Sequence, residues 1–180
     1  MPNWCRTTVR FTGEQENLDL LEKDINVITT ENRFSIAQSI NPQPDELSNV
    51  VVGYKDGAKY WWKDTEEPLA HEDIDMLFQT YGYYDWYQWR LANWGSKSGD
   101  LDTEKLRIDK NHIVFKYESA WNDLRELHKI IAEEYKLSSV VSWWEESGYH
   151  GSYKILNGKV FDENIGYDYY DGTDDIGEEE

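Results

Sequence analysis

Few side chains in this sequence are spaced for covalent catalysis. The single thiol, Cys5, could pair with His112, His128 or His150 as a nucleophile with its general base. The sequence around Cys5 shows neither a nucleophile turn nor a third group that would orient a histidine. Because Cys5 lies just before a predicted strand, we interpret it as a buried thiol that packs like a small apolar side chain.

Metal and phosphate chemistry leave no clear signature. No two histidines lie at i, i+4, and the aspartates near the C-terminus lack the alternating pattern and closing Glu of an EF-hand loop. Glycine-rich phosphate-binding loops are absent. Glu145 and Glu146 are neighbours in a predicted strand, so they face opposite sides of a sheet, and we interpret both as solvated charges. We therefore expect no cofactor, no metal and no enzymatic activity.

The charge is strongly unbalanced, with 36 acidic and 18 basic residues and a net charge of −18. Duplex DNA and anionic membranes would repel such a surface, so the charge favours a basic partner. Polar residues follow Met1, and no apolar run approaches the roughly 18 residues of a membrane helix, so neither a signal peptide nor a membrane span is predicted. With one cysteine, the expected location is the host cytoplasm.

The last 19 residues, 162–180, hold nine acids and no Lys or Arg. Tyrosines alternate with these acids, and aromatic anchors among charges are typical of binding segments. A solvated, solubilising tail is the alternative interpretation. The candidate partner-binding residues are Asp162, Glu163, Tyr167, Asp168, Tyr169, Tyr170, Asp171, Asp174, Asp175, Glu178, Glu179 and Glu180.

Nine Trp and 13 Tyr indicate a chain that folds, because burial of large aromatic surfaces offsets the entropy of ordering. Tyr60-Trp61-Trp62, Tyr83-Tyr84-Asp85-Trp86 and Trp143-Trp144 could stack on bases of single-stranded nucleic acid. Lys and Arg are sparse near these strings, so most of the aromatics are expected in the core.

The first half of the chain predicts two extended segments and two helical regions. Val9 and Phe11 share a face of a strand over Thr7–Thr12, and Leu18, Leu21 and Ile25 form the apolar stripe of a helix. Residues 34–40 alternate and predict a short strand or extended segment. Residues 45–68 predict a loop or small insertion with docked aromatics, and residues 68–94 predict helix that stops at Gly95.

The second half predicts two hairpins around a helix and a strand. Leu106–Ile108 and Ile113–Tyr117 form the first hairpin, a helix capped by Asn122 follows, and then a strand over 139–146. Asn157-Gly158 marks a type I′ turn in the second hairpin.

The predicted order is β-α-β-β-α-β, the ferredoxin-like split βαβ of an α+β protein, with an antiparallel sheet and two helices on one face. We expect a domain over 1–161 with a helical and aromatic insertion at about 42–95, followed by a C-terminal hairpin and an acidic tail at 162–180.

Several short strings occur in a characteristic order between residue 2 and about residue 151. They are Pro2 to Cys5, a strand that ends at Gly13, Ile40 to Pro44, Trp89 to Lys97, Phe115 to Trp121 and Trp144 to Gly148. Together they resemble the phage- and plasmid-encoded YubB-type (Api-like) ferredoxin-like family. Ser98-Gly99-Asp100 and Asn122-Asp123 depart from that family's usual residues. The resemblance implies a mobile-element origin and lends no catalytic residue.

These observations predict a protein that binds and inhibits a basic, nucleic-acid-handling host protein by nucleic-acid mimicry. Restriction or CRISPR-type defence enzymes would be its targets. The alternative is a module that binds single-stranded nucleic acid or a small ligand on an aromatic sheet face.

Overall fold

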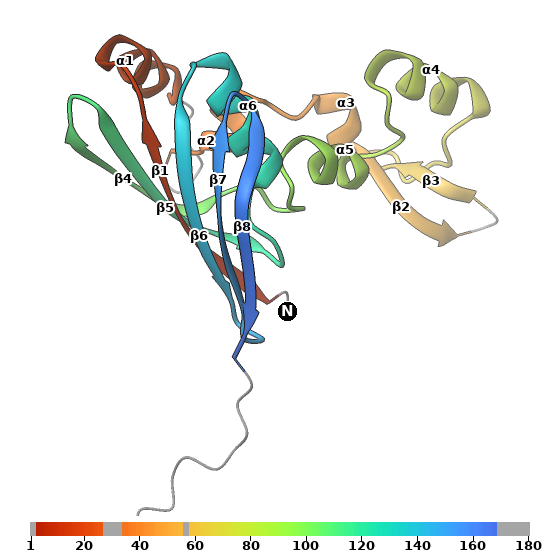
Figure 1. Ribbon diagram of the computed structural model, residues 1–180. Coiled ribbons are helices and arrows are strands. Elements are labelled where there is room, and N and C mark those ends of the chain that lie inside the picture. The colour runs from red at the N-terminus through yellow and green to blue at the C-terminus, as the bar shows by residue number, and fades with distance from the viewer. Residues whose placement is uncertain (1–2, 27–33, 56–57, 169–180) are drawn as a thin grey trace, which may run out of the picture.

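The main feature of the protein, seen in a computed structural model that describes residues 3–26, 34–55 and 58–168, is a six-stranded antiparallel sheet. The strand order is β4-β5-β1-β6-β7-β8 (Figure 1). The strands are β1 (Trp4–Thr12), β4 (Leu101–Asp109), β5 (His112–Ala120), β6 (Ser138–Glu145), β7 (Tyr149–Leu156) and β8 (Lys159–Tyr167). The predicted α+β class with an antiparallel sheet is confirmed.

Helices and a small second sheet surround this framework. The helices are α1 (Gln15–Asp24), α2 (Ile36–Ile40), α3 (Asp45–Ser48), α4 (His71–Tyr81), α5 (Trp86–Asn93) and α6 (Arg125–Glu134). The small sheet pairs β2 (Val50–Lys55) with β3 (Ala58–Trp62). Elements α3, β2, β3 and α4, which we call the side lobe, lie together beside the large sheet (Figure 1). In the described residues, every helix lacks the length or hydropathy that a membrane crossing requires.

Strand β1 is an inner strand of the sheet, and its side chains show how the two faces of the sheet differ. It pairs with β5 on one edge and with β6 on the other. The burial of its residues alternates along the strand, because successive side chains of a strand point to opposite faces. Val9 and Phe11 are fully buried in the core with Leu21 and Ile131, whereas Arg10 is exposed on the other face. One face of the sheet therefore packs on helices and the other is open.

Residues 34–40 were expected to be a strand, and this prediction was wrong. They contain helix α2, whose N-cap Ser35 accepts a hydrogen bond from the backbone N–H of Gln38 at 3.2 Å. The buried carboxylate of Asp100 also accepts hydrogen bonds from the N–H groups of Ile36 (2.9 Å) and Ala37 (2.8 Å). A helix N-terminus is stabilised by such acceptors. The acceptor comes from a distant part of the chain, so the local alternation could not reveal it.

Two further expectations needed correction. The stretch over 45–68 was interpreted as a loop, but it contains α3 and the β2–β3 hairpin, in which Trp61 is buried. Asn122 does not cap the following helix, because α6 begins at Arg125 and its N-cap position is Leu124. The Leu124 N–H instead donates to the Tyr117 hydroxyl at 3.2 Å. Tertiary contacts decided both outcomes.

The two hairpins predicted in the second half of the chain are confirmed as β4–β5 and β7–β8. Asn157 and Gly158 have φ values of 50° and 69°, as a type I′ turn requires, and they join β7 to β8. Strand β8 then continues through Tyr167, so the start of the predicted acidic tail is a strand paired with β7.

Candidate functional site

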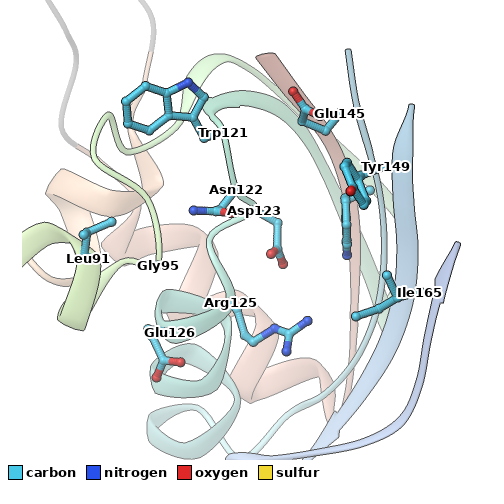
Figure 2. A pocket seen from close by; sticks show the side chains of 11 residues that line it. Leu91, Gly95, Trp121, Asn122, Asp123, Arg125, Glu126, Glu145, Tyr149 and Ile165 are labelled. Atoms are coloured by element: carbon cyan, nitrogen blue, oxygen red, sulfur yellow. The ribbon is translucent and has the colours of Figure 1, made fainter. Parts of the chain in front are cut away.

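A cleft of about 570 Å³ opens between the first turn of α6 and the ends of strands β6, β7 and β8. Figure 2 shows Asp123 and Arg125 on the α6 side of this cleft and Tyr149 and Ile165 on the strand side. Aromatic, aliphatic and charged side chains all contribute to its walls. The lining residues are Leu91, Gly95, Trp121, Asn122, Asp123, Arg125, Glu126, Trp143, Glu145, Tyr149 and Ile165.

Glu145 is the most unusual group in the cleft. It ends strand β6 and is only 6% exposed, although carboxylates are almost never buried without partners. Its Oε2 atom accepts hydrogen bonds from the backbone N–H of Ser147 at 3.1 Å and from the Ser147 hydroxyl. Its Oε1 atom and the neighbouring Trp143 Nε1–H have no hydrogen-bond partner among the described residues. The cleft therefore holds one buried acceptor and one buried donor that are both unused.

A chain of hydrogen bonds between buried side chains lies behind the cleft. The Tyr117 hydroxyl lies 2.8 Å from His128 Nε2 and accepts a hydrogen bond from the Leu124 N–H. On the other side of the ring, the Tyr153 hydroxyl lies 2.9 Å from His128 Nδ1 and donates to the carboxylate of Asp123. Because the Tyr153 proton is used by Asp123, Tyr153 accepts from His128 Nδ1–H. In a neutral His128 with its proton on Nδ1, the Nε2 atom then accepts from the Tyr117 hydroxyl.

Burial shifts the pKa values of two members of this chain, His128 and Asp123, toward their neutral forms. Burial, aided by the nearby positive charge of Arg125, lowers the pKa of His128 from 6.5 to about 3. Burial raises the pKa of the Asp123 carboxyl, and the hydrogen bond from Tyr153 opposes this shift. The lowered pKa keeps His128 neutral at neutral pH, so only one of its two ring nitrogens carries a proton.

The remaining charged groups at the cleft have partners within the chain. The Arg125 guanidinium pairs with Glu163 at 2.5 Å and lies over the Tyr153 ring, 4.5 Å from its centroid. Glu126 pairs with Lys129 at 2.6 Å. This leaves Asp123 and Glu145 as the carboxylates of the cleft that no cation neutralises directly.

Trp121 forms the rim of the cleft in a strained conformation. Its φ of 71° lies in the left-handed region, where a bulky side chain costs about 1–3 kcal/mol. Its backbone N–H donates to the carbonyl of Asn3 at 2.9 Å, and the Lys97 ammonium lies 3.5 Å from the ring centroid. The indole is 45% exposed. Strain of this kind concentrates at binding sites.

Gly95 allows the loop after α5 to approach α6 closely, which leads to a test of the cleft wall. The backbone at Gly95 has a φ of 94°. A Cβ atom at this position would lie 3.0 Å from the backbone nitrogen of Arg125 and 3.1 Å from the backbone carbonyl oxygen of Asp123. We expect Gly95→Ala to cost about 2–3 kcal/mol, measured by urea unfolding, because backbone strain and backbone contact add. Gly82→Ala is the control: φ there is 75° but nothing lies within 4 Å. Equal losses in both variants would contradict the close contact.

The described part of the predicted acidic tail makes contacts within the chain. Asp162 pairs with Lys154 at 2.5 Å, and Glu163 pairs with Arg125. Asp168 lies 3.5 Å from the Nδ1 atom of His150, and the Tyr167 ring packs against Tyr149 with centroids 4.6 Å apart. The other predicted partner-binding residues lie outside the described residues: Tyr169, Tyr170, Asp171, Asp174, Asp175, Glu178, Glu179 and Glu180.

The structure does not bring the cysteine and histidines together. Cys5 is fully buried, and its Sγ atom lies 3.8 Å from the Thr7 hydroxyl oxygen. Burial raises the pKa of this thiol to about 12, which opposes nucleophilic chemistry. His112 pairs with Asp109 at 2.8 Å, at the turn between β4 and β5. Across the residues that the structure describes, no group of three or more His, Cys, Asp or Glu side chains is arranged to hold a metal ion.

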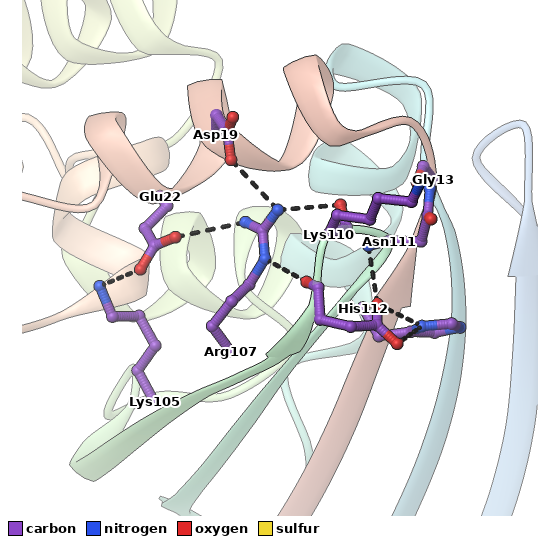
Figure 3. Close-up of polar contacts among 9 residues, drawn as sticks. Gly13, Asp19, Glu22, Lys105, Arg107, Lys110, Asn111 and His112 are labelled. Carbon is purple, nitrogen blue, oxygen red and sulfur yellow. Dashed lines mark hydrogen bonds and ion pairs between the residues drawn. The ribbon is translucent and has the colours of Figure 1, made fainter.

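The acids of α1 are also engaged within the chain. Figure 3 shows the Arg107 guanidinium between Asp19 (3.1 Å) and Glu22 (3.2 Å). Lys105 approaches the other oxygen of Glu22 at 2.8 Å. The hydrogen bond from Lys105 is the main cause of the lowered pKa of Glu22. These pairs connect α1 to strand β4 and neutralise Asp19 and Glu22, whereas Glu16 of the same helix stays exposed.

The side lobe presents acids of a different kind. Six exposed carboxylates on its helices and on the segment that joins β3 to α4 form no ion pair within the described part of the chain, although Lys63 lies among them in sequence. Exposed Met76 and Phe78 on α4 add apolar surface beside these charges. These carboxylates belong to Asp45, Glu46, Asp64, Glu67, Glu72 and Asp75.

Sequence reasoning expected an insertion at about 42–95, where the side lobe lies, but it missed the cleft and the unpaired carboxylates of the side lobe. Glu145 was interpreted as solvated, and this was wrong because its side chain is buried at the end of β6 and accepts from the Ser147 N–H. Glu146 is exposed as expected, and its Oε2 atom accepts from the Trp4 N–H at 2.9 Å. The available signal was the β6 alternation itself, which places Glu145 on the same face as buried Val141.

Taken together, these features define an α+β protein with a six-stranded antiparallel sheet, a side lobe and a cleft at the start of α6. The structure is similar to the crystal structure of protein api92 from Yersinia pseudotuberculosis, assigned to the family model DUF1281. The TM-score is 0.57 with 9% sequence identity, over 94% of this chain and 99% of that one. This likeness concerns the fold alone, and it agrees loosely with the Api-like resemblance. No family model and no curated protein matches the sequence.

Proposed function

We propose that the protein is a small acidic inhibitor, encoded by a mobile element, that binds a basic nucleic-acid-handling host protein through carboxylates that take the place of phosphates. The net charge of −18 carries this proposal. A field of this sign steers association with a cationic groove and makes the binding sensitive to salt. Restriction and CRISPR-type defence nucleases are the expected partners.

The side lobe supports this proposal better than the described tail does. The carboxylates of Asp162 and Glu163 face Lys154 and Arg125, so much of their charge is already neutralised. The six side-lobe carboxylates named above are exposed without ion pairs in the described residues, and apolar Met76 and Phe78 adjoin them. An interface needs such apolar anchors among its charges. The predicted contribution of residues 169–180 stays part of the proposal.

Neutralising the side lobe is the direct test. The variant Asp64→Asn, Glu67→Gln, Glu72→Gln and Asp75→Asn should weaken inhibition of purified defence nucleases by at least about tenfold at low salt. Each nuclease is assayed for DNA cleavage with increasing amounts of the protein. Inhibition by the wild-type chain should weaken as salt is added, because exposed charges are screened.

The matched control removes the same charge elsewhere. Glu14→Gln, Glu16→Gln, Glu133→Gln and Glu134→Gln neutralise exposed acids at α1 and α6. We expect this variant to inhibit within about twofold of the wild type, because the loss of net charge alone has a small effect on a local interface. Equal effects of both variants, or no inhibition of any nuclease by the wild-type chain, would contradict the proposal.

A second candidate function rests on the open face of the sheet. Arg10 and Lys116 are exposed there without ion pairs among the described residues, and Arg6 pairs with Glu118 at 3.0 Å. Trp144, 39% exposed, is opposite Arg6 in the β1–β6 register. Cations beside an aromatic ring suit single-stranded nucleic acid. Tight binding of a labelled single-stranded oligonucleotide that Arg10→Glu abolishes would favour this candidate over the inhibitor.

The strand order also supports a finer description of the fold. Strands β4, β5, β1 and β6 are adjacent in that order, α1 follows β1 in the chain, and α6 connects β5 to β6. This order agrees with a ferredoxin-like split βαβ core, to which β7 and β8 add two strands at one edge. The ferredoxin-like label remains our proposal.

A further inference from the structure

We infer that the cleft at the start of α6 is a binding site for a guanidinium or ammonium group on an apolar stem, such as an arginine side chain. The inference does not depend on the proposed inhibition, because it concerns a different surface and different residues. Four features of the cleft support it.

The first feature is the unused acceptor. Glu145 is more than nine-tenths buried, lines the cleft and leaves its Oε1 atom without a partner in the described residues. A buried polar atom without a hydrogen bond costs free energy. A donor that enters the cleft would remove this cost, and a cationic donor would also neutralise the carboxylate.

The second feature is the balance of charge. Arg125 is already engaged by Glu163 and by the Tyr153 ring, and Glu126 is engaged by Lys129. Asp123 and Glu145 then leave the cleft with surplus negative charge. At the α6 N-terminus, the Leu127 N–H already donates to the carbonyl of Trp94 at 3.4 Å, so this donor is not available to an anion. The charge therefore favours a cation over an anion.

The third feature is the aromatic wall. Trp121, Trp143 and Tyr149 line the cleft, and the faces of such rings attract cations. Trp121 already makes one such contact with Lys97. Figure 2 shows Trp121 and Glu145 on opposite sides of the cleft, so a cation that enters between them passes the aromatic rim before it reaches the carboxylate.

The fourth feature is the unused donor. The Trp143 Nε1–H has no partner among the described residues, and Trp143 lies on the same face of β6 as Glu145. An amide carbonyl attached to the apolar stem could accept from it. A ligand that carries both a cation and a carbonyl, as an arginine residue does, matches both unused groups.

Calorimetric titration of the full chain with Nα-acetyl-arginine amide tests the assignment without any mutation. The same titration with the citrulline amide, which has the same shape without the charge, should bind at least about tenfold more weakly. Nα-acetyl-glutamate amide, which carries the opposite charge, serves as a third probe. Equal binding of the arginine and citrulline amides, tighter binding of the glutamate amide, or no binding of the arginine amide would overturn the assignment.

Variants then locate the binding to the cleft. Glu145→Gln keeps the size of the side chain, and it should weaken binding of the arginine amide by at least about tenfold. Glu126→Gln is the matched control, since Glu126 lines the same cleft but is paired with Lys129, and it should change binding less than about twofold. Thermal melts confirm that both variants fold. Unchanged binding by a folded Glu145→Gln variant would overturn the assignment.

Two further probes identify the source of the cation. Tighter binding of a capped Gly-Gly-Arg-Gly-Gly peptide than of agmatine supports a protein side chain, and the reverse order supports a free amine. The variant with the neutralised side lobe should bind the arginine amide as the wild type does. Failure of the inhibition proposal and failure of this inference are therefore distinguishable.

Discussion

Between pH 6.5 and about 3, the free energy of unfolding should fall by about 1.4 kcal/mol for each pH unit, because folded His128 resists protonation. The imidazole is buried between Tyr117 and Tyr153, with Arg125 nearby, and burial lowers its pKa from 6.5 to about 3. In this interval the unfolded chain binds a proton that the folded chain does not. Acid therefore favours unfolding, and above pH 6.5 this contribution is constant.

Other groups act at lower pH. The pKa of Asp123 is raised by burial, so in the range above its ordinary value of 3.8 the folded chain holds this proton more tightly, which opposes the effect of His128. The pKa values of Glu22 and Asp109 are lowered from their ordinary values of 4.5 and 3.8. The stability that these two carboxylates give the folded protein is therefore lost as the pH falls toward and below those values. Between about pH 7.5 and about pH 5, His128 contributes an expected loss of about 2 kcal/mol, and the raised pKa of Asp123 acts in the opposite direction.

The variant His128→Gln provides the control. Glutamine does not titrate and keeps one donor and one acceptor, so the variant should be about 1–3 kcal/mol less stable at neutral pH but should lose less stability on acidification. Urea unfolding at each pH measures both quantities. The same dependence on pH in wild type and variant would show that His128 is not the responsible group.

Local periodicity predicted the parts of the fold that depend on neighbouring residues. Leu18 and Leu21 were expected on the buried stripe of the first helix, and both are fully buried in α1. The alternation of β1 and the Asn157-Gly158 turn were also recognised, because φ preferences and side-chain direction are properties of a few adjacent residues.

Features that depend on distant residues were not predicted. The helix over 36–40 has its N-terminus capped by Asp100, so a pattern that resembled a strand became a helix. Glu145 changed from a predicted solvated charge to a buried one, because residues from α5, α6 and three strands close around it. Its significance lies in the unused oxygen, which is a tertiary property with no counterpart in the sequence.

The predicted helical stripe itself leads to a large effect with a closely matched control. Leu21 is 0% exposed, and adjacent Leu20 on the same helix is 47% exposed. Leu21→Ala removes buried methyl groups and leaves a cavity between α1 and the sheet, so we expect it to cost about 2–5 kcal/mol. Leu20→Ala makes the same chemical change on the surface, where the expected cost is within about 0.5 kcal/mol.

Urea unfolding of the two variants at neutral pH measures this difference. Helix propensity cannot produce it, because both substitutions replace Leu with Ala within one helix. The slope of unfolding against urea should stay the same in both variants, since each unfolds the same surface. Similar costs for Leu20→Ala and Leu21→Ala would mean that α1 does not pack on the sheet through Leu21. The Arg107 and Lys105 ion pairs would then be what keeps α1 in place.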